Sequence, residues 1–220
     1  MRRLLSTWLV LTVSVALTLA SIVAGMREAA PFFASGTSIE SKFASLSVEM
    51  DPPGLSFFSK RMVLDDCNFT LNSISIVMLD DADQTSIRRN CGAVASAIVA
   101  EAPSFSYAWY IKALAGDAGE QEAVFEDALL RSRRFAPNQE DLAFYRAVLT
   151  YYHWQFLSAP AQAELTSDIV VAAHSSRGRL WVAKRYIDDE AYREVVVDAM
   201  EKAPADIQRY FLQSVASLSS

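Results

Sequence analysis

The segment NQEDLAFYRAVLTYYHWQF, residues 138–156, decides the fold class of this chain. Its apolar residues recur at steps of three and four, which is the spacing of one face of an α-helix. The main stripe consists of Leu142, Tyr145, Leu149, Tyr152 and Phe156, and it is widened by Phe144, Val148 and Tyr151. A stripe this wide predicts a helix buried between neighbours on more than one side. Asn138, three residues before Asp141, is predicted to be its N-cap.

The same spacing continues through most of the chain after Gly54, whereas no long alternation of apolar and polar residues indicates a sheet. We therefore predict an all-α fold. The predicted helices are 56–79, 83–101, 104–115, 120–135, 139–157, 161–174, 177–186, 189–202 and 205–217. Ser104 is expected to cap one of them, and Pro160 suits the first turn of another because a first-turn residue needs no N–H donor.

An uncharged apolar run from Leu4 to Ala24 precedes this region. About 20 residues of helix cross the hydrocarbon core of a bilayer, so the run predicts a transmembrane signal-anchor over residues 1–26. A cleavable export signal has a shorter apolar centre, but Val23 and Gly25 could serve as a cleavage site, which keeps that alternative open.

Arg2 and Arg3 precede the run and favour an amino terminus held in the cytoplasm. Residues 27–55, which are rich in serine and interrupted by prolines and glycines, are predicted to be a tether and irregular segment. Residues 56–220 are predicted to form the helical domain, on the far side of the membrane.

The charge balance restricts the partners. Without Arg2 and Arg3 the chain carries 18 basic and 26 acidic residues, a formal charge of −8 against −6 for the whole chain. Nucleic acid is not expected as a partner, because phosphate binding needs a basic surface. Arginine outnumbers lysine 15 to 5 and alanine is abundant, which is typical of a bacterial coding bias. We therefore predict a single-pass protein of a bacterial inner membrane with its carboxyl-terminal domain in the periplasm.

The only cysteines are Cys67 and Cys91. In an oxidising compartment an even count predicts a disulfide, although two separate buried thiols are the alternative. Their spacing does not fit a zinc site, in which paired ligands lie two to four residues apart.

Catalytic motifs are absent from the sequence. His153 and His174 lie on different predicted helices without metal-ligand spacing, and there is no nucleophile elbow, phosphate loop or dinucleotide fingerprint. Adjacent aspartates, such as Asp188 and Asp189, point in different directions on a helix. The sequence therefore predicts a protein that is not an enzyme and that uses no cofactor and no metal.

Two features are candidate interaction sites. Basic residues gather at two places in an otherwise acidic domain, where they could either complement helix dipoles or bind an acidic polysaccharide or acidic partner. Aromatic residues are also dense, and any that are exposed would be platforms for a peptide or a sugar. The candidate interaction residues are Arg131, Arg133, Arg134, Arg177, Arg179, Trp109 and Trp154.

Residues 103–137 resemble a tetratricopeptide repeat. Pro103 and Pro137 lie 34 residues apart and each follows an alanine. Trp109 lies between them. A break at Gly116–Gly119 leads into a helix that carries Ala123, Phe125, Ala128 and Leu129. The resemblance covers about 34 residues and implies an antiparallel helix-hairpin array, in which the segments 60–101 and 139–159 would be degenerate units.

Helical arrays of this kind offer curved surfaces to partners without catalysing a reaction. In general style the chain is also similar to small proteins of bacterial envelope and exopolysaccharide assembly. We therefore expect a non-catalytic, membrane-anchored scaffold or adaptor with a protein partner in the envelope. The alternatives are a polysaccharide-binding or polysaccharide-active envelope protein, and a helix bundle whose anchor makes the specific contacts.

Overall fold

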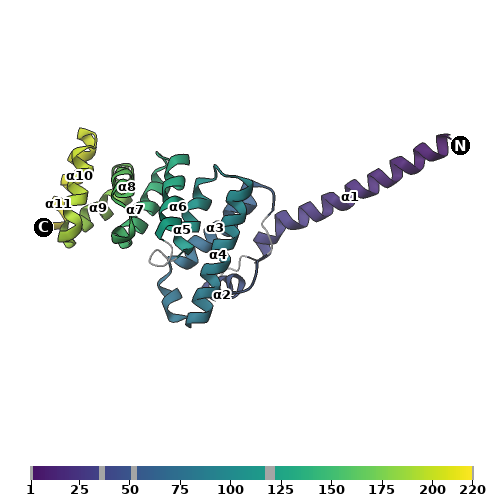
Figure 1. Ribbon diagram of the computed structural model, residues 1–220, viewed down its shortest axis with the longest axis horizontal. Helices are drawn as coiled ribbons and strands as arrows, with labels where there is room; N and C mark the ends of the chain where they lie inside the picture. Colours follow the sequence, from purple (N-terminus) through teal and green to yellow (C-terminus); the bar gives the residue numbers. More distant parts are fainter. Residues whose placement is uncertain (1, 35–37, 51–53, 117–121, 220) are drawn as a thin grey trace. The chain divides into compact units, whose positions relative to one another are not determined.

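The computed structural model describes residues 2–34, 38–50, 54–116 and 122–219, and every regular element in these ranges is helical (Figure 1). The predicted all-α class is therefore confirmed. The chain divides into two compact units, Met1–Ala97 and Ile98–Ser220, which are called unit 1 and unit 2.

Unit 1 begins with one long apolar helix. Its elements are α1 (Arg2–Ala34), α2 (Ile39–Ser47), α3 (Phe57–Leu71), the 3-10 helix η1 (Ile74–Met78) and the first part of α4 (Asp81–Glu101). Residues Trp8–Phe33 of α1 are long and apolar enough to cross a membrane, and no residue of the 18-residue apolar window within them is buried in the protein. The apolar face of α1 is therefore available to lipid.

Helical structure extends into the segment 27–55, to which the sequence pattern assigned none. Helix α1 continues through Pro31 to Ala34, and its last turn is supported by the stacking of Phe32 on Phe58, with ring centroids 5.5 Å apart. Helix α2 is short, but Ser38 caps its first turn and Phe43 and Leu46 are buried.

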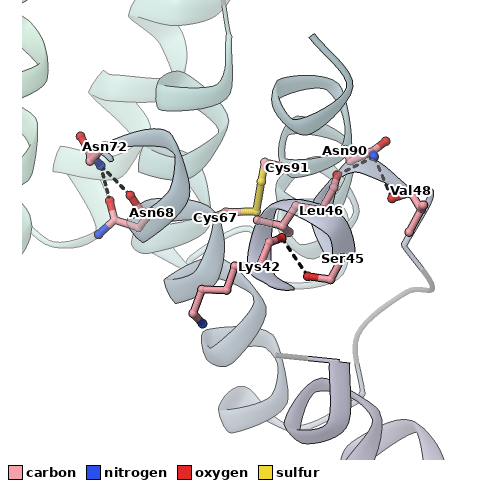
Figure 2. Close-up of a disulfide and its surroundings, with 9 residues drawn as sticks. All are labelled: Lys42, Ser45, Leu46, Val48, Cys67, Asn68, Asn72, Asn90 and Cys91. Atoms are coloured by element: carbon pink, nitrogen blue, oxygen red, sulfur yellow. Dashed lines mark hydrogen bonds between the residues drawn. A yellow bond between two sulfur atoms is a disulfide. The ribbon is translucent and has the colours of Figure 1, made fainter. Parts of the chain in front are cut away.

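The carboxyl end of α2 is fastened to α4 (Figure 2). Asn90 on α4 donates hydrogen bonds of 2.8 Å to the carbonyl oxygens of both Leu46 and Val48. These acceptors are among those that a helix end leaves without an intrahelical partner. Helix α2, which its weak local pattern did not predict, is thus held by two buried side chains and by the hydrogen bonds from Asn90.

Cys67 of α3 and Cys91 of α4 form the predicted disulfide, with their sulfur atoms 2.07 Å apart (Figure 2). The bond joins the last third of α3 to the middle of α4. Both cysteines are fully buried, and the structure therefore describes a bridge instead of two separate thiols.

The single helix predicted over 56–79 is two elements. Helix α3 ends at Leu71, where the backbone N–H of Asn72 bonds to Asn68 and its side chain donates to the Asn68 carbonyl at 2.9 Å. Ser73 then starts η1 by accepting from Ser75 N. Asparagine and serine compete with the helix for backbone hydrogen bonds, which explains the break.

Unit 2 consists of the end of α4 and seven further helices in the residues described. These are α5 (Ser106–Ala115), α6 (Glu122–Phe135), α7 (Glu140–Tyr152), α8 (Ala159–Ala172), α9 (Ser176–Asp188), α10 (Glu190–Glu201) and α11 (Ala205–Ser219), with a 3-10 helix η2 (Trp154–Phe156) after α7. Helix α5 packs on α6, α7 on α8, and α9 on α10 and α11; α5 also touches α7, and α6 and α10 both touch α8. Two helix pairs, α5 with α6 and α7 with α8, therefore contact each other, and α9, α10 and α11 pack together after them.

Two predicted caps are wrong. Helix α7 begins after Gln139 without a side-chain cap, so Asn138 does not cap it, and α5 begins after Phe105 instead of Ser104. The prediction for Pro160 is confirmed, since it lies in the first turn of α8 behind the cap Ser158.

Candidate functional site

An open pocket of about 350 Å³ lies where the end of α7 and η2 meet the start of α10. Its lining is mainly aromatic and includes one carboxylate. The lining residues are Tyr151, Tyr152, Trp154, Gln155, Asp189, Ala191 and Tyr192, and this set is called the aromatic pocket. Ligand pockets commonly combine apolar walls with a few fixed polar groups.

The rings of the aromatic pocket pack edge to face. Tyr192 is buried, and the ring centroids of Tyr151 and Trp154 lie 4.8 Å and 5.8 Å from its own, at interplanar angles of 81° and 89°. Tyr152 packs on Tyr151 with centroids 5.0 Å apart, yet 63% of Tyr152 is exposed. The buried ring of Tyr192 thus holds the position of rings that face solvent.

Asp189 is fixed by two hydrogen bonds. The Tyr151 hydroxyl donates to its Oδ2 at 2.8 Å, and the backbone N–H of Tyr192 donates to its Oδ1 at 3.1 Å. The second bond makes Asp189 the N-cap of α10. These bonds, that from Tyr151 first, lower the pKa of the Asp189 carboxyl, and the nearby Arg185 contributes further. Asp189 is therefore ionised at neutral pH.

Arg185 balances this charge. Its Nη1 donates to the Tyr151 hydroxyl at 3.2 Å, and its guanidinium lies 5.1 Å from the centroid of the Tyr151 ring. The hydroxyl accepts from Arg185 and donates to Asp189, so a cation and an anion are linked through one tyrosine. The aromatic pocket consequently carries little net charge.

The Tyr192 hydroxyl lies buried without a hydrogen-bond partner among the residues described. Burial raises the pKa of this phenol, and the nearby Tyr151 and Asp189 raise it further. Tyr192 is therefore neutral at neutral pH and can serve as a donor.

Of the two tryptophans predicted as candidates, only Trp154 lines the aromatic pocket. Trp109 is buried, its Nε1 donates to the Pro103 carbonyl at 2.7 Å, and the Arg131 guanidinium lies 4.9 Å from its ring centroid. The indole of Trp109 therefore fixes the start of α5 and offers no open platform.

The first arginine cluster is occupied by internal contacts. Arg131 pairs with Asp127 at 2.7 Å, and Arg133 pairs with Asp168 at 2.8 Å. Arg134 is exposed and has no ion-pair partner among the residues described. Only one of the three predicted guanidinium groups is therefore open to an anionic ligand.

Asp168 also binds a buried arginine that was not among the predicted site residues. Arg146 of α7 is fully buried and donates from Nε and Nη2 to the two oxygens of Asp168 on α8, each at 2.7 Å. It also donates to the Ala136 carbonyl at 3.2 Å, just after α6. The network joins α6, α7 and α8.

The second arginine cluster is likewise engaged. The Arg177 guanidinium lies 4.4 Å from the ring centroid of Phe144, and Arg179 donates to the Ala173 carbonyl at 3.2 Å. Arg179 also lies over Tyr210, 5.3 Å from its centroid. These contacts stabilise helix ends and aromatic faces within unit 2.

Of the pocket's residues, Trp154 was a predicted candidate and Tyr151 and Tyr152 lie beside it in the sequence, whereas Asp189 and Tyr192 were not expected at the site. Asp189 is the N-cap of α10, and nothing local in the sequence indicates that this cap faces η2. Tyr192 belongs to α10, and only the packing of α10 on α8 and α9 brings it to Tyr151. The residues described include no group of three His, Cys, Asp or Glu side chains placed to hold a metal ion.

The chain has no match among known protein families, and no curated protein or solved structure is significantly similar to it. The function must therefore be argued from the chain's own residues.

Proposed function

We propose that this protein is a non-catalytic, membrane-anchored adaptor of the bacterial envelope that binds a neutral saccharide chain in the aromatic pocket. The observation that carries the proposal is the placement of exposed and half-buried rings beside the fixed carboxylate of Asp189. The anchor is α1, and unit 2 supplies the binding surface.

The chemistry of the aromatic pocket favours a sugar. The C–H face of a hexose packs on an aromatic ring, while its hydroxyls need polar partners at the edge. Tyr152 and Trp154 offer the rings, and Asp189 and Gln155 offer an acceptor and an amide.

The charge favours a neutral sugar over an acidic one. The charge of Asp189 is balanced by Arg185, whose guanidinium is already engaged by Tyr151, so the aromatic pocket offers a uronate no unpaired cation. A cationic ligand is disfavoured too, because Arg185 compensates the carboxylate. Most of the guanidinium groups that prompted the expectation of an acidic polysaccharide are paired within the protein.

A binding role is favoured over hydrolysis because the aromatic pocket has a single carboxylate in its lining. Glycosidases need two carboxyl groups across the scissile bond, about 5 to 9.5 Å apart. The neighbouring Asp188 pairs with Lys184 at 3.1 Å and does not line the pocket.

A protein-binding scaffold is the second candidate. Within unit 2 α5 pairs with α6 and α7 with α8, and the two pairs contact each other through α5 with α7 and α6 with α8, which supports an array similar to tetratricopeptide repeats. Such an array could hold an envelope partner while the aromatic pocket holds the saccharide, in exopolysaccharide assembly for example.

The proposal is tested with the full chain in lipid nanodiscs, titrated by calorimetry with hexamers of glucose and N-acetylglucosamine, a galacturonate hexamer and a proline-rich peptide. We expect a neutral hexamer to bind. Tyr152→Ala should weaken it about 2- to 13-fold, because one aromatic contact is worth about 0.5–1.5 kcal/mol.

Tyr210→Ala is the matched control, since it removes a part-exposed ring from α11 in the same unit. Binding of the uronate or the peptide instead of any neutral hexamer would overturn the saccharide assignment. So would equal effects of the two substitutions.

A further inference from the structure

Five large apolar side chains, each more than half exposed, gather where α1 leaves its apolar run. They come from two segments that are distant in the sequence, the end of α1 and the start of α3. The set is Phe32, Phe33, Leu55, Phe57 and Phe58, and it is called the outer apolar patch. Contiguous exposed apolar side chains mark interaction surfaces.

A polar joint fixes the two segments to each other. The Glu28 carboxylate of α1 accepts hydrogen bonds from the backbone N–H of Ser56, at 2.8 Å, and from the Ser56 hydroxyl, at the N-terminus of α3. Gly54 passes so close that an added Cβ would lie 2.6 Å from Glu28 Cδ. Phe32 stacks on Phe58 beside this joint.

When α1 spans a bilayer, the outer apolar patch lies at the level of the leaflet on the side of the helical units. Leu55 lines an apolar pocket of about 400 Å³ together with Leu19, Ala20, Val23, Ala24 and Arg27 of α1. Leu55 therefore lies beside the apolar run itself. From residue 3 to residue 33 a helix is about 45 Å long, which is about the full thickness of a bilayer with its headgroups. Phe32 and Phe33 thus reach the headgroup layer on the far side.

We propose that the outer apolar patch docks into the lipid leaflet on the side of the helical units, so that unit 1 is held at the bilayer by α3 as well as by α1. The occupant is lipid because the patch is continuous with the lipid-exposed face of α1. Arg27 is exposed beside it and can extend to lipid phosphates. This inference rests on the proposed anchor.

The test places a fluorescent label at single added cysteines in the full chain, since Cys67 and Cys91 are held in their disulfide. The protein is reconstituted in vesicles of phosphatidylethanolamine and phosphatidylglycerol that carry nitroxide-labelled lipid. Phe58→Cys reports on the patch, and Phe57→Cys is a second reporter in case one substitution disturbs folding. Leu17→Cys reports on the anchor. Ile74→Cys is the control, because Ile74 is a large, exposed apolar residue of unit 1 beyond the opposite end of α3.

We expect strong quenching at position 17, and quenching at positions 57 and 58 that exceeds that at 74 by roughly twofold or more. Quenching at 17 with equal, weak quenching at 57, 58 and 74 would overturn the docking proposal and leave the anchor intact. Absence of quenching at 17 would overturn the anchor and the docking proposal together.

Discussion

The Asp168 carboxylate receives the fully buried Arg146 guanidinium through two hydrogen bonds of 2.7 Å, one to each oxygen. Arg133 approaches the same carboxylate from α6 at 2.8 Å. One buried anion therefore organises cations from two other helices of unit 2. Removing one partner of a buried ion pair destabilises a protein strongly, because the other charge stays buried without compensation.

Asp168→Ala should destabilise the protein by about 3–5 kcal/mol, because it leaves the Arg146 charge buried without a counter-ion. Chemical unfolding measures the change. Asp127→Ala, which breaks the exposed pair with Arg131, is the control and should cost about 1 kcal/mol or less. Similar losses in the two variants would contradict the assigned role of the buried pair.

Cys67→Ser should lower the free energy of unfolding by about 3–4 kcal/mol, because the bridge closes a loop between residues 24 apart in the sequence. Adding Cys91→Ser should cost little more, since the bond is already lost. Mass spectrometry after alkylation without reduction checks the bond itself. Two alkylated cysteines in protein from the native membrane would refute it.

Tyr151→Phe should raise the pKa of Asp189 toward its ordinary value of 3.8, because the largest cause of the lowering is the hydrogen bond from that hydroxyl. A lowered folded-state pKa stabilises the protein above the ordinary value and ceases to do so as the pH falls through the folded pKa. The loss of unfolding free energy in the variant should therefore be full at neutral pH and shrink in acid.

Carbon-13 NMR titration of the carboxyl group measures the pKa of Asp189. Unfolding at values from about pH 6 to about pH 2 measures the loss of stability. Tyr152→Phe, at the exposed neighbour, is the control and should leave the Asp189 titration unchanged. An unshifted Asp189 in Tyr151→Phe would contradict the proposed hydrogen bond.

Gly178→Ala should destabilise unit 2 by about 1–3 kcal/mol, as expected when a closely packed site is overfilled. A Cβ at this position in α9 would meet the carbonyl group at the end of α8, with Ala172 C only 2.7 Å away. Gly116→Ala is the control, since its Cβ would make contacts of 3.4 Å. Thermal unfolding compares the two, and equal melting temperatures would rule out the close approach.

Most of the fold was predictable because it depends on local spacing. The stripe of residues 142–152 and the first-turn Pro160 depend on the chain near them, and most helices lie close to their predicted places, but the helix predicted over 139–157 ends at Tyr152 and is followed by the separate η2. Helix α2 was missed because Asn90, 42 to 44 residues away, caps its end. The split after Leu71 was missed because apolar residues continue past the asparagine and serine that end α3.

The candidate site was predictable only in its aromatic part. Trp154 and its tyrosine neighbours lie together in the sequence, whereas Asp189 and Tyr192 join them through helix packing. Arg146 offered a usable signal, since a charge inside the wide apolar stripe of 142–156 must be paired when it is buried. The arginine clusters were predicted as interaction sites because a sequence does not reveal that an arginine is paired with an internal partner such as Asp168.

We propose that α1 anchors a binding domain on the exported side of a membrane. The most direct test of this proposal is alkaline phosphatase fused after residue 220 in a bacterial host, compared with a reporter that is active only in the cytoplasm at the same point. An anchor in α1 predicts phosphatase activity that stays with the membranes after alkaline extraction, and an inactive cytoplasmic reporter. Activity of the cytoplasmic reporter alone would contradict it.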